Sequence, residues 1–322
     1  MKKIAIVDSD FEDACIEERM AYEAGMDIAL FQDPSPEGII SNAQDADGIV
    51  TSYGRFSERV FEALPNLRVV SRTGVGFDSI DINAATDHGV AVCNVPGYGT
   101  EVVSDHAIAL TLDVLRRTNE LDAALRRGVW PYGSHRPLGQ VHGRVFGVVG
   151  MGEIGRATAR KANGLGFQVI CTSRSLKPGR RTPEGYDIVT YDELLQRADV
   201  VSFHTALTDD TRHLLDAEHL ALMKNTAVVV NTSRGAVIDT AALATALKAD
   251  RLWGAGLDVF EEEPVGMDHP LFSAPHTVLT PHVAYWSEES GVELRTRAMQ
   301  AVIDVLSGNR PLDCLNLQVF GE

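Results

Sequence analysis

The chain has 322 residues, of which 44% are hydrophobic, and its 45 acidic and 29 basic side chains give a formal net charge of −16. This length is typical of about two domains. Because an acidic protein repels phosphate backbones and anionic lipid, we expect neither nucleic acid nor a membrane surface as a partner. The apolar runs are also far shorter than the roughly 20 residues of a membrane span.

The four cysteines indicate the setting of the protein. Cys15, Cys93, Cys171 and Cys314 lie far apart in the sequence and form no C-x-x-C pair. This spacing argues against a disulfide framework or a zinc site, so we expect no metal and a reducing, cytoplasmic location. Residues 1–8 place an acid directly after a short apolar run and lack a small-residue cleavage site, which favours a first strand over a signal peptide.

Short apolar runs alternate with amphipathic segments over the first hundred residues. This alternation predicts a parallel sheet that is covered by helices on both faces. The expected strands are Ile4–Val7, Ile28–Phe31, Gly48–Thr51, Arg68–Ser71 and Val90–Cys93. The expected helices are Asp13–Ala24, Ser57–Leu64, Ile82–His88 and a long one over Glu101–Arg117.

A second alternating series follows the Gly/Pro/His-rich segment Gly128–Gly143. Its expected strands are Val145–Val149, Gln168–Cys171, Val200–Phe203, Ala227–Val230, Gly254–Leu257 and Val278–Leu279. Its expected helices are Ile154–Asn163, Tyr191–Gln196, Ala217–Leu222 and Thr240–Ala249, and another long helix covers Ser287–Leu306.

Two α/β series with a long helix at each junction predict two doubly wound parallel-sheet domains. We expect a discontinuous first domain, residues 1–100 plus 288–322, and a second domain over residues 101–287. Periodicity alone does not show the return to the first domain, because a separate C-terminal helix would give the same pattern.

A glycine pattern at the start of the second series indicates a dinucleotide site. Gly150, Gly152 and Gly155 form G-x-G-x-x-G around Glu153 and Ile154, between an expected strand and an expected helix. The first glycine allows the tight turn, the second admits a pyrophosphate, and the third lets helix and strand pack closely. The helix then directs free N–H groups at the phosphates.

The end of the next strand suggests the coenzyme. An NAD protein usually carries an acid there for the ribose hydroxyls, but this chain continues with Ser173 and Arg174. Both could bind a 2′-phosphate, so we favour NADP(H), with NAD(H) as the alternative. Arg174 could equally be a solvated loop residue.

Three later segments place chemically active residues at the ends of expected strands. They carry Arg234, the acidic run 261–263 and His282. Singly, these are more often a turn residue, a charged loop and a packed imidazole. Together they suit hydride chemistry on a 2-oxoacid, because a guanidinium binds the carboxylate, an imidazole gives a proton, and a carboxylate orients that imidazole.

At nearly full length the sequence resembles the D-isomer-specific 2-hydroxyacid dehydrogenase family. The matching stretches are, in order, RTGVGFDSID (72–81), GVAVCNVPG (89–97), GVVGMGEIGR (147–156), NTSRG (231–235), LDVFEEEP (257–264) and TPH (280–282). Residues 95–105 and 285–290 look closest to the subgroup of the C-terminal binding protein corepressors. The resemblance implies a flavodoxin-like substrate domain and a Rossmann cofactor domain.

The resemblance also assigns roles. It implies Arg234 as the ligand of the substrate carboxylate and carbonyl, His282 as the general acid/base, and Glu263 as the residue that holds and tunes His282. It implies substrate contacts for Arg72 and for the backbone N–H groups of Val75 and Gly76. The remaining expected cofactor-binding residues are His204, Thr205, Ala206, Thr232 and Asp258, the last beside the nicotinamide carboxamide.

Two departures limit what the subgroup implies. The acidic residue that usually binds the ribose hydroxyls of NAD is replaced by Ser173. This arrangement is similar to that of NADP-using glyoxylate/hydroxypyruvate reductases. The aromatic pair Tyr285–Trp286 reverses the order found in the corepressors.

We therefore expect an NADP(H)-preferring D-2-hydroxyacid dehydrogenase that reduces a small 2-oxoacid such as glyoxylate or hydroxypyruvate. The alternatives are a non-catalytic dinucleotide sensor and a phosphite-type dehydrogenase on the same scaffold. We also expect a homodimer, built on the Trp130–Gly143 segment and the long helix over Glu101–Arg117.

Overall fold

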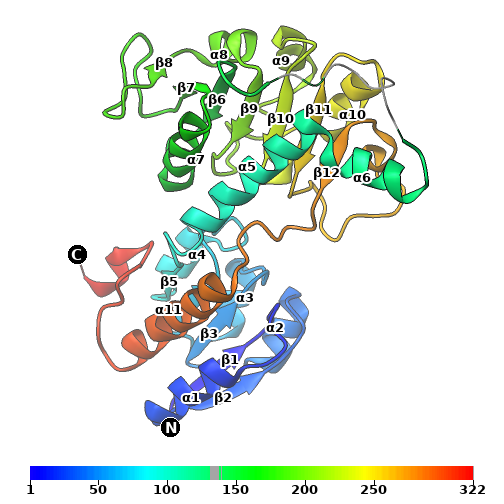
Figure 1. Ribbon diagram of the computed structural model, residues 1–322. Coiled ribbons are helices and arrows are strands. Elements are labelled where there is room, and N and C mark those ends of the chain that lie inside the picture. Colours follow the sequence, from blue (N-terminus) through cyan, green and yellow to red (C-terminus); the bar gives the residue numbers. More distant parts are fainter. Residues whose placement is uncertain (131–137, 139, 322) are drawn as a thin grey trace. The chain divides into compact units, whose positions relative to one another are not determined.

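The computed structural model describes residues 1–130, 138 and 140–321. The chain folds into two compact units (Figure 1). Unit 1 comprises Met1–Tyr98 and Ser287–Glu322, and unit 2 comprises Gly99–Trp286. Unit 1 is thus built from both ends of the chain, whereas unit 2 is one continuous segment.

Unit 1 contains a five-stranded parallel sheet of order β2-β1-β3-β4-β5, as in flavodoxin-like folds. Its strands are β1 (Lys3–Ile6), β2 (Asp27–Leu30), β3 (Gly48–Thr51), β4 (Val69–Arg72) and β5 (Ala91–Cys93). Each predicted strand is confirmed, and no boundary differs by more than one residue. The apolar runs form central strands because helices bury both faces of the sheet.

Two sets of helices cover this sheet (Figure 1). They are α1 (Cys15–Glu23), α2 (Pro36–Asn42), α3 (Glu58–Ala63), α4 (Ile82–Asp87) and α11 (Glu288–Leu306), and a short turn, η3 (Leu317–Phe320), follows α11. Helices α2, α3 and α4 share one hydrophobic core with the strands, while α11 packs on β3 and β4 beside α1. Helix α2 was not predicted because Pro36 and Gly38 interrupt its apolar periodicity. The Ser35 side chain caps this helix by accepting from Gly38 N at 3.0 Å.

Unit 2 contains a seven-stranded parallel sheet of order β12-β11-β10-β9-β6-β7-β8. Its strands are β6 (Val145–Val149), β7 (Gln168–Thr172), β8 (Asp187–Ile188), β9 (Val200–Phe203), β10 (Val228–Asn231), β11 (Gly254–Leu257) and β12 (Thr277–Leu279). The six predicted strands are confirmed, and the two-residue β8 was too short to predict. The order reverses between β6 and β9, and such a switch point opens a crevice for ligands at the carboxyl ends of the strands.

Helices cover both faces of the second sheet as well (Figure 1). They are α5 (Thr100–Arg116), α6 (Thr118–Arg126), α7 (Glu153–Gly164), α8 (Tyr191–Arg197), α9 (Ala217–Leu222) and α10 (Thr240–Lys248), with the short turns η1 (Gly235–Val237) and η2 (Pro270–Ser273). One core joins α8, α9 and α10 to the sheet, and the other joins α5 and α7. Arg117 adopts a left-handed conformation with φ 55°, which ends α5 and starts the unpredicted α6. Within the described ranges, no helix combines the length and apolar composition needed to cross a bilayer.

A buried ion pair joins the two ends of the chain within unit 1. Arg295 on α11 donates to both carboxylate oxygens of Glu17 on α1, at 2.8 and 2.6 Å, and also to the backbone oxygen of Asp13 at 2.8 Å. Arg295 and Glu17 are only 8% and 5% exposed. Removing one member of a buried pair leaves an uncompensated charge, which costs about 3–5 kcal/mol.

We therefore predict that Arg295→Met loosens unit 1. The buried Glu17 carboxylate loses its partner, so amide hydrogen exchange in α1 and α11 should accelerate by about a hundredfold or more. Peptide-resolved exchange measures this directly. Arg19→Met, on the exposed side of α1, should leave the rates unchanged, and Glu17→Leu combined with Arg295→Met should recover most of the loss. Equal rates in the Arg295→Met variant and the parent would contradict the assignment.

Candidate active site

The glycine loop lies at the switch point of the second sheet, between β6 and β9. Gly150 has φ +97°, and a Cβ placed on it would lie 2.5 Å from the carbonyl oxygen of His204. A Cβ on Gly155 would lie 2.0 Å from the carbonyl oxygen of Gly150. No atom lies within 4 Å of a Cβ built on Gly152. The first and third glycines are thus required by packing within the protein, and the second leaves open space.

That open space lies at the N-terminus of α7, where Gly152 is the N-cap. The unpaired N–H groups of a helix N-terminus attract anions such as a pyrophosphate. A second feature also fits a bound dinucleotide, because the buried Oγ1 of Thr232 has no hydrogen-bond partner among the described residues. Buried hydroxyls normally have a partner, so Thr232 is available to a ligand.

The loop after β9 has its polar groups fixed. His204 N donates to the backbone oxygen of Val149 at 2.8 Å, and His204 Nε2 lies 2.8 Å from Ser202 Oγ. Burial lowers the pKa of the His204 imidazole to about 4, so the ring is neutral at neutral pH. Thr205 and Ala206 follow directly and are partly or fully exposed at the carboxyl end of the sheet.

Ser173 and Arg174 follow the last residue of β7, as predicted. Ser173 is half-buried and Arg174 is exposed. Two nearby arginines are paired, Arg181 with Asp187 at 2.8 Å and Arg156 with Glu184 at 3.0 Å. The positive charge of Arg181 is therefore already partly neutralised.

Glu263 and His282 form a hydrogen-bonded pair. His282 Nδ1 lies 2.6 Å from Glu263 Oε2, and Glu263 Oε1 accepts from Phe260 N at 2.8 Å. Burial by itself would raise the pKa of the Glu263 carboxyl. The hydrogen bond and charge of His282, the Phe260 N–H and the Arg234 charge all lower that pKa. Together they outweigh burial, so the pKa of Glu263 lies below its usual range. The carboxylate thus stays ionised and keeps Nδ1 protonated, which leaves Nε2 of the imidazole as the reactive nitrogen.

Arg234 lies on a turn that packs against the Glu263 loop. A Cβ on Gly235 would lie 1.8 Å from the carbonyl carbon of Phe260, so the two backbones are in direct contact. Asn231, at the end of β10, fixes the turn by donating from Nδ2 to the Arg234 backbone oxygen at 2.9 Å and accepting from Ser233 N at 2.9 Å. The turn of Arg234 therefore lies against the loop of Glu263, where the Arg234 charge helps to lower the Glu263 pKa, and Arg234 Nη1 donates to the Ser233 backbone oxygen at 2.9 Å.

Asp258 positions the segment that carries His282. Its carboxylate is fully buried and accepts from Thr280 Oγ1 at 2.6 Å, Val283 N at 3.0 Å and Ala284 N at 2.9 Å. The Asp258 backbone oxygen accepts from His282 N at 2.7 Å. These contacts hold the carboxylate within the protein, and the expected position of Asp258 beside the nicotinamide carboxamide stays a prediction.

The backbone of His282 is held in an uncommon conformation. Its φ is 53°, in the left-handed region that L-residues rarely adopt outside turns and functional sites. The Asp258 contacts on both sides of His282 stabilise this conformation and aim the imidazole at Glu263. His106 on α5 supports the same segment through Thr280 Oγ1, 2.9 Å from its Nε2.

Three predicted substrate residues belong to unit 1. Arg72 ends β4 and donates from Nε to the Ser52 backbone oxygen at 3.2 Å. Val75 and Gly76 follow in a loop that Asn94 supports by donating to the Val75 backbone oxygen at 2.6 Å. Within the described part of the chain, the N–H groups of Val75 and Gly76 have no hydrogen-bond acceptor.

Two residues that shape the site were not predicted from the sequence. Asn231 is the first residue of the NTSRG stretch, and a polar residue that ends a run of valines is a signal that could have identified it. Glu261 was treated as part of an acidic run, but its carboxylate accepts from Thr240 N at 2.9 Å and pairs with His213 at 2.8 Å. Glu261 thereby ties the loop of Glu263 to the start of α10.

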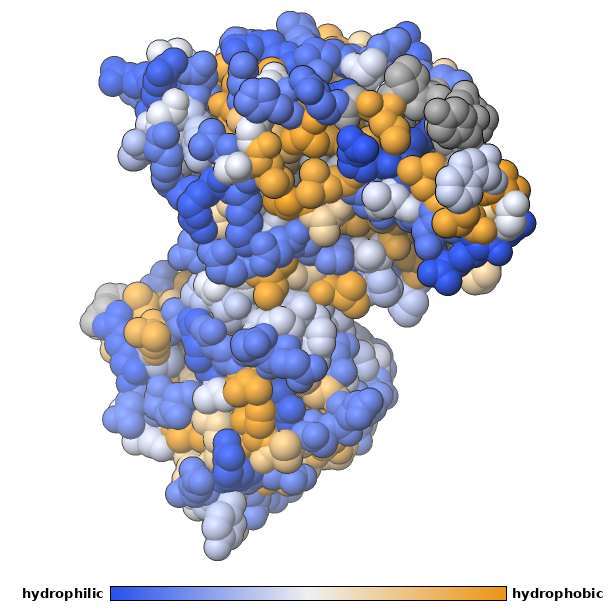
Figure 2. All heavy atoms as spheres, in the orientation of Figure 1, coloured by the Kyte–Doolittle hydropathy of each residue, from blue (hydrophilic) through white to orange (hydrophobic). Residues whose placement is uncertain are grey.

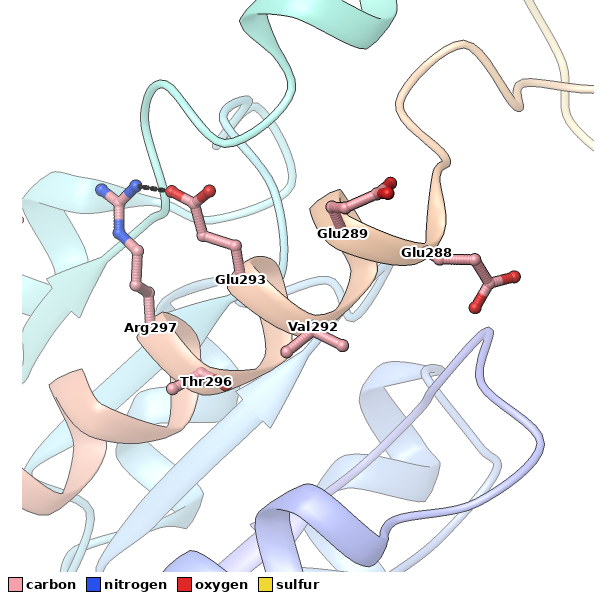
Figure 3. A pocket seen from close by; sticks show the side chains of 6 residues that line it. All are labelled: Glu288, Glu289, Val292, Glu293, Thr296 and Arg297. Atoms are coloured by element: carbon pink, nitrogen blue, oxygen red, sulfur yellow. Dashed lines mark hydrogen bonds and ion pairs between the residues drawn. The ribbon is translucent and has the colours of Figure 1, made fainter.

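A separate depression on unit 1 lies along α11 (Figure 3). Glu293 and Arg297, one turn apart on the helix, pair at 2.8 Å along it, and Glu288 and Glu289 add negative charge. This acidic surface does not suit an anionic substrate. Within the described ranges, no group of three or more His, Cys, Asp or Glu side chains could hold a metal ion.

Comparison with known proteins gives the family. Residues 108–284, more than half of the chain, match the model described as "D-isomer specific 2-hydroxyacid dehydrogenase, NAD binding domain". The chain belongs to this family. As a D-2-hydroxyacid dehydrogenase it is an oxidoreductase that transfers a hydride between a nicotinamide cofactor and a 2-oxoacid. The predicted fold class and enzyme class are thereby confirmed.

Relatives and solved structures agree along nearly the full length. The chain is 39% identical over 304 residues to a glyoxylate reductase of Korarchaeum cryptofilum, and the match covers 92% of each chain. An NADPH-dependent glyoxylate/hydroxypyruvate reductase of Sinorhizobium meliloti in complex with NADP and malonate has a TM-score of 0.86 at 28% identity, over 98% of this chain and 96% of that one. An acyclic imino acid reductase in complex with NADPH and D-Arg has a TM-score of 0.88 at 26% identity, over 98% and 100%.

The glycines of this dehydrogenase provide a test of the cofactor loop. We predict that Gly152→Ala leaves the melting temperature unchanged, because its Cβ meets no protein atom, but weakens dinucleotide binding about tenfold or more, because the methyl group fills the space for the pyrophosphate. Gly155→Ala should instead lower the melting temperature, since its Cβ would contact the Gly150 backbone. Calorimetry and coenzyme titration separate the two effects. Tight coenzyme binding by the Gly152→Ala variant would exclude the assigned cofactor loop.

Proposed function

We propose that the protein reduces small 2-oxoacids of the glyoxylate or hydroxypyruvate kind, with His282 as the proton donor. The observation that carries the proposal is the 2.6 Å contact between His282 Nδ1 and Glu263 Oε2, because it leaves Nε2 to face a substrate oxygen. The names of the Korarchaeum relative and the Sinorhizobium structure support this substrate class. In this proposal, unit 2 binds the coenzyme and unit 1 contributes substrate contacts.

The residues of the chain divide the work. When bound, the coenzyme supplies the hydride that reduces the substrate carbonyl. His282 donates a proton to the carbonyl oxygen, and the ionised Glu263 stabilises the charged imidazole before the transfer. Arg234 binds the substrate carboxylate and draws electron density from the adjacent carbonyl. The family resemblance assigns the N–H groups of Val75 and Gly76 to substrate binding, and these groups have no acceptor in the described part of the chain.

We predict that His282→Ala lowers kcat for 2-oxoacid reduction by about 10²–10⁴-fold, because the proton relay is lost. Undiminished turnover in this variant would refute the role of His282.

A panel of glyoxylate, hydroxypyruvate, pyruvate, an imino acid and phosphite, each with NADPH and NADH, identifies the substrate. Turnover of phosphite alone would replace the proposed substrate class, and no turnover at all would favour a dinucleotide sensor.

The pH dependence tests Glu263. Its pKa is lowered, so the pair with His282 contributes stability above the usual pKa of a carboxyl and loses it as the pH falls through the lowered value. The ionised carboxylate attracts positive charge on the imidazole ring that it contacts. We predict that kcat/KM for reduction begins to fall at a lower pH in the Glu263→Gln variant than in the parent protein. A profile of kcat/KM against pH measures this shift. Glu262→Gln, a matched change at an exposed neighbour, should leave the profile in place.

We further propose a preference for NADP(H), in which Ser173 and Arg174 bind the 2′-phosphate. Both residues follow β7, where the family acid for the ribose hydroxyls is absent, and Arg174 is exposed. We predict that Arg174→Asp shifts the ratio of kcat/KM for NADPH to that for NADH by about tenfold or more toward NADH. Lys177→Asp, an equal charge change in the same exposed loop, should leave the ratio unchanged. The same ratio in both variants would exclude Arg174 as the phosphate ligand.

A homodimer is the third element of the proposal. Helix α6 and the residues after it expose Leu125, Val129 and Trp130, at 53%, 52% and 77%. Figure 2 shows apolar side chains gathered on the surface over α6. Such a patch marks an interface more often than a solvated surface. Residues 131–137 and 139 of the Trp130–Gly143 segment, which was predicted to contribute, lie outside the described residues.

We predict a mass of about twice the 34.9 kDa chain by light scattering. Leu125→Glu together with Trp130→Glu should give the monomer mass, because two charges would be buried at the interface. Leu312→Glu, at the 88% exposed leucine of unit 1, is the control and should leave the dimer intact. A monomeric parent protein would disprove this element of the proposal.

A further inference from the structure

The segment after α11 runs along the outer edge of β5 in unit 1. Leu315 N donates to the Val92 backbone oxygen at 2.8 Å. The Asn316 side chain accepts from Val92 N at 2.8 Å and donates to the Val90 backbone oxygen at 2.9 Å. These bonds form a short antiparallel bridge in which Cys93 lies opposite Cys314.

The register of this bridge suits a disulfide. The hydrogen bond between Leu315 and Val92 lies one residue beyond each cysteine, so Cys93 and Cys314 form a non-hydrogen-bonded pair of the ladder. Residues at such a position have Cα atoms about 4.5 Å apart with their side chains close together. A disulfide needs a Cα separation of about 4.4–6.8 Å. All four cysteines are free thiols in the structure.

The two thiols differ in reactivity. The hydrogen bond from Cys93 lowers the pKa of the Cys314 thiol to about 6, and the nearby backbone N–H groups and Arg310 add to the effect against the opposing influence of burial. The same interaction, together with burial, raises the pKa of Cys93. Cys314 is half-buried and Cys93 is fully buried. The thiolate form is thus favoured at Cys314, and the protonated thiol is favoured at Cys93 beside it.

The other two cysteines lack this combination. Cys15 is exposed, but its hydrogen bond to Asp13 raises the pKa of its thiol. Cys171 is buried, and burial raises the pKa of its thiol to about 11. Exposure alone would make Cys15 the reactive cysteine, whereas thiolate character makes it Cys314.

We propose that Cys93 and Cys314 form an oxidation site that a hydroperoxide converts into an intramolecular disulfide. The Cys314 thiolate attacks the terminal oxygen of the peroxide, the O–O bond breaks, and the leaving oxygen takes up a proton to form an alcohol, or water from hydrogen peroxide. Cys314 becomes a sulfenic acid. The Cys93 sulfur then attacks the Cys314 sulfur, and the hydroxide leaves with the Cys93 proton as water. One peroxide is reduced by two electrons and two thiols are oxidised.

The bond would tie the end of the chain to the edge of the first sheet. It closes a covalent loop of about 220 residues, and long loops gain the most from a cross-link because the unfolded chain loses the most freedom. The oxidised protein should therefore melt several degrees above the reduced protein, and a thiol reductant should reverse the change.

The test uses the full chain and hydrogen peroxide. The protein is treated with about a tenfold excess, alkylated, digested without reductant and mapped by mass spectrometry. We expect one linked pair of peptides that contains Cys93 and Cys314, two hydrogens lighter than the sum of the free peptides, while Cys15 and Cys171 remain alkylated. Modification of Cys15 before Cys314, or a sulfinic acid at Cys314 without the link, would overturn the proposal.

Two variants sharpen the result. Cys93→Ser should leave a sulfenic acid on Cys314 that dimedone traps, because the resolving thiol is absent. Cys15→Ser is the matched control and should keep the link. A Cys93→Ser protein with no trapped sulfenic acid would also overturn the proposal. None of these measurements depends on turnover, so the result stands apart from the proposed enzymatic function.

Discussion

The candidate active site depends on one buried carboxylate. Asp258 directly follows the apolar strand β11. Its side chain accepts three hydrogen bonds from the segment 280–284, and its backbone N–H donates to Asn231 at the end of β10. An unpaired charge in such a place would cost several kcal/mol, so these bonds specify the segment's conformation strongly. The left-handed backbone of His282, and hence the direction of its imidazole, follows from this constraint. The position of His282 is thus set by Asp258, which the end of β11 holds in place.

Two carboxylates near one imidazole have different tasks because their surroundings differ. Asp258 bonds mainly to backbone N–H groups and fixes position, whereas Glu263 bonds to the ring of His282 and affects charge. The site also gathers positive potential in a chain of net charge −16. Arg234 and the N–H groups at the N-terminus of α7 provide local attraction for an anionic substrate and a coenzyme phosphate that the acidic surface repels.

Much of this architecture could be predicted from the sequence, since continuous apolar strands and a glycine pattern are local signals. The first and third glycines have the expected packing, and Glu263, the acid before Pro264, is the one that contacts His282, whereas Glu261 contacts His213. What could not be predicted depends on contacts between distant segments. Helix α6 requires a left-handed Arg117, and the role of Asp258 appears only when residues 280–284 fold over it. Cys93 and Cys314, which seemed unrelated by spacing, lie opposite each other because the last segment returns to β5.

The return of the chain to unit 1 has a consequence for biosynthesis. Helix α11 supplies Leu294, Ala298, Met299 and Val302 to the core on one face of the first sheet, and Arg295 neutralises Glu17. A nascent polypeptide that ends before residue 287 can complete unit 2, whose contacts are internal to one segment. Residues 1–98 of unit 1 then still lack α11, so one face of their sheet is uncovered and Glu17 has no Arg295 to pair with. The part that is translated first is therefore the part whose fold is completed last.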